Sequence, residues 1–415
     1  MDDTLASEVA RHLVPIASKP LGIAVSGGSD SLCLLYILAD LRQELGLVLK
    51  AVTVDHRLRP EAAEEARIVA ANCADLGIPH QTLVWAGWDG QGNKQGAARR
   101  ARYSLMTEWA REEKVPQIAL GHTEDDQAET VLMRLARGAG VDGLSAMRPE
   151  REHNGVTWLR PLLSISRTAL REDLNRRGVQ WLDDPGNDDA SYDRIKARRA
   201  LDKLAPLGID RAILARVAGH MQSARDALEA QTLNVAGQCV TEHCGSLCIN
   251  WPRLIEAPDE ILRRVVLASL QWVGRAEYPP RASALDGVLA RLTAVTSATL
   301  DGCLLLRKKN NLWICRELSA VGEQLAPLDA LWDGRWRVCG GTAPESSYIG
   351  VLGEDALSAC ENWRDLGLPR QVLAVTPAIW HGQNLVAAPL VNRAGPWQAE
   401  RQRDGSSLFD ALFAH

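Results

Sequence analysis

Two clusters of polar residues in the first third of the chain could carry out chemistry on an anionic substrate. The first is a glycine- and serine-rich loop of Ser26, Gly27, Gly28, Ser29, Asp30 and Ser31. Its glycines let a phosphate approach the backbone, and its hydroxyls add donors. Such a loop in front of a helix binds anions, because unpaired amides and the helix dipole both favour negative charge.

The second cluster places a histidine before three acids: His122, Asp125, Asp126 and Glu129. Carboxylates close to a phosphate-binding loop suit Mg²⁺, which prefers oxygen ligands shared with substrate phosphates, and we expect Asp126 to bind it. Acids at a helix start also suit the dipole, so capping is the alternative for Asp125 and Asp126. If the helix begins at His122, then His122, Asp126 and Glu129 share one face.

Strands and helices alternate around these clusters. Apolar runs predict strands over residues 21–25, 47–54, 81–85, 117–120 and 158–163, with helices between them. This pattern predicts a doubly wound parallel sheet. Because ligands bind at the carboxyl ends of such strands, Asp55 is expected to accept hydrogen bonds from a nucleoside, with a solvated turn as the alternative.

The prediction for the whole chain is an α/β catalytic domain over residues 1–207, a helical linker over 208–235, and an α+β region over 236–415, the latter as one or two small domains. Ser166 is expected to cap a helix that ends at Arg177 before Gly178. Arg99 and Arg102 are three apart on a predicted helix and could meet one anion, or could form a solvated basic face. A later segment is also basic: Arg194, Lys196, Arg198 and Arg199.

Composition limits the class of protein. The 415 residues are 46% hydrophobic and 24% charged, as in soluble globular proteins. No apolar run reaches the roughly 18 residues of a membrane helix, and the acidic start lacks a signal peptide's basic region, so we expect a cytoplasmic protein without a membrane partner. Nine cysteines without a CxxC pair argue against a disulfide framework or a zinc ribbon. The net charge of −5 means that RNA contacts would depend on local basic patches.

The loop at residues 26–31 resembles the PP-loop of the N-type ATP pyrophosphatases, which cleave ATP between the α and β phosphates. It lacks the lysine of a Walker A motif. Taken together with later motifs, the first half resembles the tRNA(Ile)-lysidine synthetases, an RNA-modifying branch of that family. The other matching motifs, spread over about residues 20–205, are Val54-Asp55-His56 with Leu58-Arg59; Ala98-Arg99 with Arg102-Tyr103; Gly121-His122 with Asp125-Asp126-Gln127 and Glu129-Thr130; Arg137-Gly138 with Gly140 and Gly143-Leu144; Arg160-Pro161-Leu162; and Trp181 with Asp183-Asp184-Pro185 and Asn187.

One motif departs from the family. An Arg-Asn pair usually follows the Asp-Asp-Pro loop, whereas this chain has Tyr192-Asp193 before Arg194. The contacts of that pair are therefore in doubt here, although the neighbouring basic residues are present.

The resemblance implies ATP-dependent ligation of free L-lysine to C2 of the wobble cytidine of a tRNA(Ile) with a CAU anticodon, through an adenylated cytidine. The PP-loop residues 26–31 and Arg99 would bind ATP, and Asp55 would fix the nucleoside. Arg102 and Mg²⁺ would offset charge on the leaving pyrophosphate. His122 or Asp126 would take a proton from lysine, and Asp125 or Glu129 would meet either lysine or the metal.

The resemblance also gives the remaining residues and partners their expected roles. Asp30, His122, Asp126 and Arg102 are the predicted catalytic residues. Arg194, Lys196, Arg198 and Arg199 are expected to bind tRNA, helped by the C-terminal region. The oligomeric state is open, with a homodimer as one option.

Two other interpretations compete with the ligase. One is a different PP-loop enzyme, such as a tRNA thiolase or an amidating synthetase. Thiolases of this type need catalytic cysteines, and Cys33 and Cys73 do not lie beside the motifs. The other is a nucleotide-binding module without catalytic activity, which the acids at 125, 126 and 129 disfavour.

Overall fold

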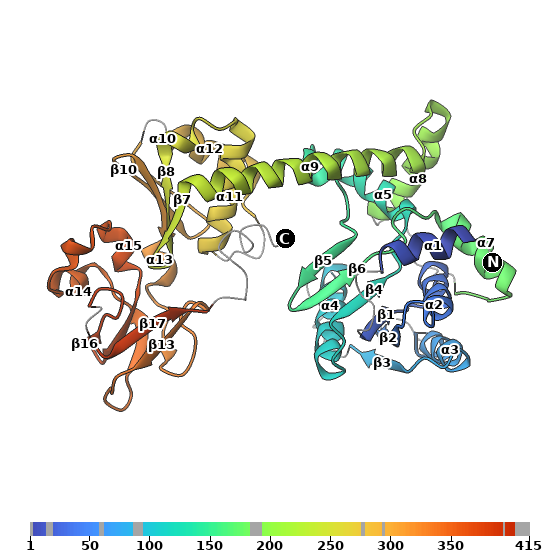
Figure 1. The fold of residues 1–415 in the computed structure, drawn as a ribbon, viewed down its shortest axis with the longest axis horizontal. Coiled ribbons are helices and arrows are strands. Elements are labelled where there is room, and N and C mark those ends of the chain that lie inside the picture. The colour runs from blue at the N-terminus through green and yellow to red at the C-terminus, as the bar shows by residue number, and fades with distance from the viewer. Residues whose placement is uncertain are drawn as a thin grey trace. The chain divides into compact units, whose positions relative to one another are not determined.

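A computed structural model describes residues 3–13, 20–57, 62–85, 94–182, 193–274, 279–292, 295–392 and 395–402. The chain forms two compact units, Met1–Asp226 and Ala227–Ala414 (Figure 1). The division falls within one helix, α9 (Arg211–Cys239). The boundaries that we placed at residues 207 and 235 therefore stay predictions.

A mixed sheet forms the centre of the first unit, in the order β3-β2-β1-β4-β6-β5. All neighbouring strands pair in parallel except β5, which is an antiparallel edge. This confirms the predicted parallel α/β sheet. Its strands are β1 (Pro20–Ala24), β2 (Val48–Asp55), β3 (His80–Val84), β4 (Gln117–Leu120), β5 (Glu150–His153) and β6 (Val156–Leu159).

Two details of the strand prediction were wrong. The strand expected over residues 158–163 ends at Leu159, two residues before Pro161, which has no N–H for a strand hydrogen bond. The edge strand β5 was not predicted, and all its residues are exposed, so no apolar pattern marks it.

Helices cover both faces of this sheet because side chains alternate along each strand. Leu21 and Ile23 of β1 pack with apolar residues of α1, α2, α3 and α7. Ala24 packs on the other face with Trp109 of α4. A Cβ atom on Gly22 would lie 3.0 Å from the Trp109 ring, so this glycine makes room for it. The helices are α1 (Asp3–Arg11), α2 (Ser29–Leu41), α3 (Ala62–Asp75), α4 (Lys94–Glu112), α5 (Glu124–Leu135), α6 (Val141–Leu144), α7 (Arg167–Arg177), α8 (Asp193–Leu204) and the 3₁₀ turn η3 (Ala205–Leu207).

The strand order reverses at β1, which has β2 on one side and β4 on the other. In open α/β sheets, ligands bind outside the carboxyl ends of the strands at such a reversal. Residues 26–31 follow β1, Asp55 ends β2, and residues 121–123 follow β4. The sheet therefore places all three candidate segments at one edge.

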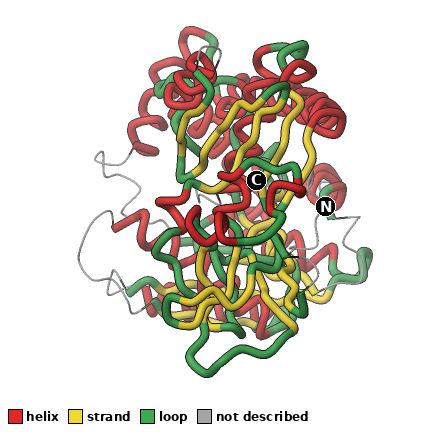
Figure 2. Tube along the Cα trace, turned by 90° about the vertical axis from the view of Figure 1, so that its left-hand side faces the viewer, coloured by secondary structure: helices red, strands yellow, loops and turns green. Residues whose placement is uncertain are grey.

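The second unit contains smaller sheets, as predicted. An antiparallel sheet, β7-β8-β11-β10-β9, packs with apolar residues of α11 and α12. A second sheet, β12-β14-β15-β16, and the ribbon β13-β17 share a core rich in tryptophan. Figure 2 shows the helices in red and the strands in yellow. Across the described ranges, no helix has both the length and the apolar content to span a membrane.

The elements of the second unit have the following bounds: β7 (Val240–His243), β8 (Ser246–Asn250), α10 (Trp251–Leu254), α11 (Asp259–Gly274), α12 (Ala282–Leu292), β9 (Ser297–Leu300), β10 (Cys303–Lys308), β11 (Asn311–Arg316), α13 (Leu318–Val321), β12 (Ala326–Pro327), β13 (Trp336–Gly340), β14 (Tyr348–Val351), α14 (Glu354–Ala359), η4 (Trp363–Leu366), α15 (Arg370–Ala374), β15 (Pro377–His381), β16 (Asn384–Ala387) and β17 (Trp397–Arg401).

Candidate active site

The glycine- and serine-rich loop closes around one hydroxyl. The Ser31 Oγ atom accepts a hydrogen bond from Ser26 N at 3.1 Å and donates one to Gly28 O at 3.1 Å. Gly27 has a φ of +88°, which favours glycine. Gly28 is the N-cap of α2 and has no side chain to cap it, so the first amides of the helix can meet an anion.

The two sequence clusters lie together because β4 ends against the start of α2. A Cβ atom on Gly121 would lie 2.9 Å from Ser31 N and 3.0 Å from Ser31 Cα. Any other residue at this position would push the two backbones apart. Glycine at 121 therefore lets the segment that carries His122 and the acids approach the anion-binding loop.

The helix that carries the acids begins at Glu124, after an N-cap at Thr123. Asp126 Oδ2 accepts hydrogen bonds from Thr123 N at 2.9 Å and from Thr123 Oγ1 at 3.1 Å. One oxygen of Asp126 is thus a capping group. His122 precedes the helix, so the condition under which His122, Asp126 and Glu129 would share one helical face is not met.

Asp125 points to the starts of two other helices. Its Oδ2 atom accepts a hydrogen bond from Arg167 N at 2.8 Å. Its Oδ1 atom lies 3.2 Å from Arg211 Nε, at the start of α9. Both oxygens of Asp125 therefore have partners among the described residues.

Glu129 is fully buried among cationic side chains. Its Oε1 atom lies 3.0 Å from Arg198 Nε and 3.9 Å from Arg167 Nη1, and its Oε2 atom lies 3.9 Å from Arg194 Nε. Among the described residues, Oε2 has no hydrogen-bond partner. Burial and the charge of Asp126 raise the pKa of Glu129, against the opposing effect of Arg198 and Arg167.

The four residues predicted to bind tRNA lie on α8 and divide into two pairs. Arg194 and Arg198 face Glu129, as described above. Lys196 and Arg199 are exposed, and Lys196 Nζ lies 3.5 Å from Asp193. The chain thus offers two exposed cations here for a phosphate backbone.

Arg167 is a site residue that sequence reasoning missed. Its Nε atom donates to Asp30 Oδ2 at 2.9 Å, and its Nη2 atom lies 3.5 Å from Asp126 Oδ1. One turn later, Arg171 Nε donates to Ser29 Oγ at 3.3 Å. Both arginines lie on α7, which packs against α2 (Figure 1). The sequence feature that could have indicated them is a pair of arginines four residues apart, immediately after the helix cap Ser166.

His122 lies beside Asp126 at this edge and is kept neutral. Burial lowers the pKa of His122 to about 3, and the attraction of Asp126 only partly opposes this. Within the described part of the chain, its Nδ1 atom has no hydrogen-bond partner. A neutral imidazole with an unused nitrogen can accept a proton or a hydrogen bond.

Arg102 and Asp55 lie at the neighbouring strand end. Burial, followed by the charge of Arg102, lowers the pKa of His56, so the arginine lies near the end of β2. Asp55 is buried there and its Oδ1 atom accepts a hydrogen bond from Arg57 N at 2.8 Å. Arg99 is exposed and lies over the Tyr103 ring at 5.3 Å.

Asp30 and Asp126 are the carboxylates that suit a magnesium ion. Both lie beside the anion-binding loop, and their hard oxygen atoms match the preference of Mg²⁺. The described residues contain no group of three or more His, Cys, Asp or Glu side chains that could hold a metal by themselves.

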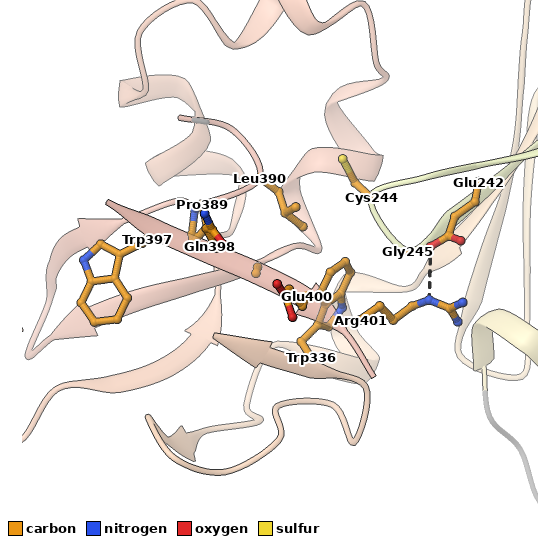
Figure 3. A pocket seen from close by; sticks show the side chains of 11 residues that line it. Glu242, Cys244, Gly245, Trp336, Pro389, Leu390, Trp397, Gln398, Glu400 and Arg401 are labelled. Atoms are coloured by element: carbon orange, nitrogen blue, oxygen red, sulfur yellow. Dashed lines mark ion pairs between the residues drawn. The ribbon is translucent and has the colours of Figure 1, made fainter. Parts of the chain in front are cut away.

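Several motif residues lie outside the described residues: Leu58-Arg59, Asp183-Asp184-Pro185, Asn187 and Tyr192. The second unit contains a separate hollow of about 610 Å³ (Figure 3). Trp336, Trp397 and an ion pair between Arg401 and Glu242 line it, with 3.2 Å between Arg401 Nε and Glu242 Oε1. No predicted site residue takes part in this hollow.

Known proteins resemble this chain along its whole length. A family model described as a PP-loop domain matches residues 1–205. The tRNA(Ile)-lysidine synthase of Ruegeria pomeroyi is 45% identical over 414 residues, which cover 99% of both chains. The chain belongs to the tRNA(Ile)-lysidine synthase family.

The chain is also similar to a second named relative and, distantly, to a solved structure. The tRNA(Ile)-lysidine synthase of Zymomonas mobilis is 44% identical over 270 residues, covering 62% of this chain and 77% of the relative. A solved structure of the U34-tRNA thiolase NcsA from Methanococcus maripaludis has 18% identity and a TM-score of 0.46, covering 52% of this chain and 77% of the thiolase. That distant similarity carries no argument about activity. The family membership confirms the resemblance inferred from the ordered motifs.

Proposed function

We propose that the protein uses ATP to ligate L-lysine to C2 of the wobble cytidine of a tRNA(Ile) with a CAU anticodon. The products would be lysidine, AMP and pyrophosphate. The observation that carries this proposal is the contact of Gly121 with Ser31, which brings an anion-binding loop and an acid-rich helix start to one sheet edge. A relative named for this activity and matching nearly the whole chain supports it.

In the first step, the C2 oxygen of cytidine attacks the α-phosphate of ATP. The new bond joins that oxygen to phosphorus, and the bond from the α-phosphorus to the bridging oxygen breaks, so pyrophosphate leaves. The amides at the start of α2 would bind the phosphates, with Arg171 beside Ser29 as an added cation. Arg102 would offset charge on the leaving group, and Asp55 would fix the nucleoside.

Mg²⁺ would be held by Asp126, with Asp30 as the neighbouring carboxylate and phosphate oxygens completing its coordination. It would neutralise charge on the departing pyrophosphate. Asp126 Oδ2 accepts two hydrogen bonds from Thr123, so Oδ1, which lies 3.5 Å from Arg167 Nη2, is the oxygen that would bind the ion.

In the second step, the ε-amine of lysine attacks C2, the bond from C2 to the oxygen breaks, and AMP leaves with that oxygen. The lysine ammonium must first lose a proton. His122 and Asp126 are the candidate acceptors by position: among the described residues His122 Nδ1 has no hydrogen-bond partner, but the burial that lowers the pKa of His122 also makes it a weak base, and Asp126 Oδ2 is engaged by its cap. Glu129, whose Oε2 atom has no hydrogen-bond partner in the described part of the chain, is the acid that would meet lysine.

The expected contacts with tRNA are inferred from the exposed cations of α8 and from the position of the reacting atom in the base. Lys196 and Arg199 are exposed on α8 and would contact the tRNA backbone. The cytidine would leave its stack in the anticodon loop, because a stacked base cannot present its C2 edge. A homodimer and a cytoplasmic location stay predictions.

The test is nucleoside mass spectrometry after incubating the full chain with unmodified tRNA(Ile) transcript, ATP, Mg²⁺ and isotope-labelled lysine. We expect one labelled lysine per tRNA, together with release of AMP and pyrophosphate. A transcript with uridine at the wobble position is the matched control and should stay unmodified. Absence of lysine from the CAU transcript would exclude the ligase, and ATP binding without tRNA-dependent pyrophosphate release would favour a binding module.

A further inference from the structure

One guanidinium stands among three carboxylates of the site. Arg167 lies 2.9 Å from Asp30, 3.5 Å from Asp126 and 3.9 Å from Glu129, measured from its Nε, Nη2 and Nη1 atoms. Its side chain is 18% exposed. Asp30 belongs to the ATP-binding loop, whereas Asp126 and Glu129 belong to α5. The three nitrogens of Arg167 therefore connect the two halves of the site.

The backbone around Arg167 is fixed to α5. Ser166 Oγ caps α7 by accepting a hydrogen bond from Ala169 N at 3.2 Å. Arg167 N donates to Asp125 Oδ2 at 2.8 Å. Glu124 N donates to Ile165 O at 3.0 Å. The first turn of α7 is thus bound to the first turn of α5, and this sets where the guanidinium lies.

Among the described residues, Arg167 alone forms ion pairs with all three carboxylates. Glu129 has Arg194 and Arg198 as additional partners. In the same described ranges, Asp30 forms an ion pair with Arg167 only. Without Arg167, three largely buried carboxylates would repel one another, and Asp30 would lose the contact that orients it toward α5. A lysine at this position could supply the charge but not the planar fork that reaches several carboxylates.

We propose that Arg167 is a positioning residue that fixes the ATP-binding loop to the acids of α5, so that adenylation and lysine transfer occur in one site. This rests on the function proposed above and names a residue with a role in both steps. Arg167 acts through Asp30, Asp126 and Glu129 and is not itself a reacting group.

The experiment measures the two steps separately with the full chain. Pyrophosphate release without lysine reports adenylation of the tRNA, and incorporation of labelled lysine at varied concentration reports the KM for lysine. In Arg167→Met we expect adenylation to slow about 100-fold and the KM for lysine to rise at least tenfold. Arg167→Lys should recover part of the adenylation rate, to within about tenfold of wild type. The matched control is Arg176→Met on the same helix, because the ion pair that the described residues show for Arg176 is with Asp173 of that helix.

A double-mutant cycle separates positioning from a general effect on folding. If Arg167 acts through the PP-loop aspartate, the variant with both Arg167→Met and Asp30→Asn should lose no more adenylation rate than the worse single variant. If the losses in adenylation rate of the two single variants multiply in the double variant, the proposal is overturned. It is also overturned if Arg167→Met adenylates tRNA within threefold of the wild-type rate. If Arg167→Met fails to fold, Arg167→Lys carries the test, and full activity in that variant would overturn the proposal. A wild-type chain that makes no lysidine would instead refute the proposed function.

Discussion

The backbones of Gly121 and Ser31 are in contact, so that a Cβ atom at position 121 would lie 2.9 Å from Ser31 N. This contact joins the end of β4 to the first turn of α2. This contact sets the distance between the anion-binding loop and the helix that carries the acids. Several measurable consequences arise from this arrangement and from the contacts around it.

Replacing Gly121 by alanine should damage the site and the first unit together. The atoms that the new methyl group meets belong to the backbone of Asp30 and Ser31 and cannot turn away. We expect a loss of about 1–3 kcal/mol in the free energy of unfolding and adenylation at least tenfold slower. Gly219→Ala is the matched control, because nothing lies within 4 Å of its added Cβ in α9. Thermal unfolding checks the first expectation and pyrophosphate release the second, and adenylation at the wild-type rate in Gly121→Ala would contradict the second.

Glu129 and Asp125 should behave differently when each is made neutral. Glu129→Gln removes a buried charge facing Arg198 and should slow lysine transfer at least 100-fold, while adenylation changes less than tenfold. Asp125→Asn keeps an oxygen for Arg167 N, so the KM for lysine should change less than threefold and only the melting temperature should fall. Equal effects of the two substitutions on lysine transfer would contradict the assignment of lysine to Glu129.

His80 should make the stability of the first unit depend on pH. Burial lowers the pKa of His80, whose Nε2 atom lies 2.8 Å from Thr53 Oγ1. Because the folded pKa is below that of the unfolded chain, the unfolded state binds more protons as pH falls. The contribution of His80 to the free energy of unfolding is therefore present above about pH 6.5 and declines below it.

The measurement compares wild type with His80→Gln, whose amide can still donate to Thr53. Urea unfolding at pH 7 and at pH 5.5 should show a larger loss of unfolding free energy in wild type than in the variant. The same loss in both proteins would show that His80 does not contribute.

Asp333 should be essential for the stability of the second unit. Its carboxylate lies 3.1 Å from Arg316 and 2.8 Å from Arg335, and all three side chains are largely buried. Asp333→Asn leaves two buried guanidinium groups without their counter-charge and should cost about 3–5 kcal/mol of unfolding free energy. The exposed pair of Arg370 with Glu354 is the control, since Glu354→Gln should cost no more than about 1 kcal/mol. Chemical unfolding monitored by tryptophan fluorescence distinguishes the two, and equal small losses would contradict the prediction.

The sequence predicted the first unit well where local rules apply. The periodicity of apolar residues predicted β4 with its correct bounds and a helix behind the loop, although α2 begins at Ser29, within the loop. Ser166 and Gly178 marked the ends of α7, because a serine cap and a left-handed glycine act within one turn of the chain. The edge strand β5 was missed because its exposed residues have no apolar pattern.

The amino-acid sequence alone determined the family, the alternation of strands and helices in the first unit apart from β5, and the two polar clusters, because each depends on residues that are neighbours in the chain. Tertiary structure decided which hydrogen-bond and ion-pair partners the acids have. Capping by Asp126 depends on where α5 begins, and the role of Asp125 depends on α7 and α9. Arg167 and Asp30 are 137 positions apart in the chain, and only the packing of α7 on α2 brings the guanidinium to the PP-loop carboxylate.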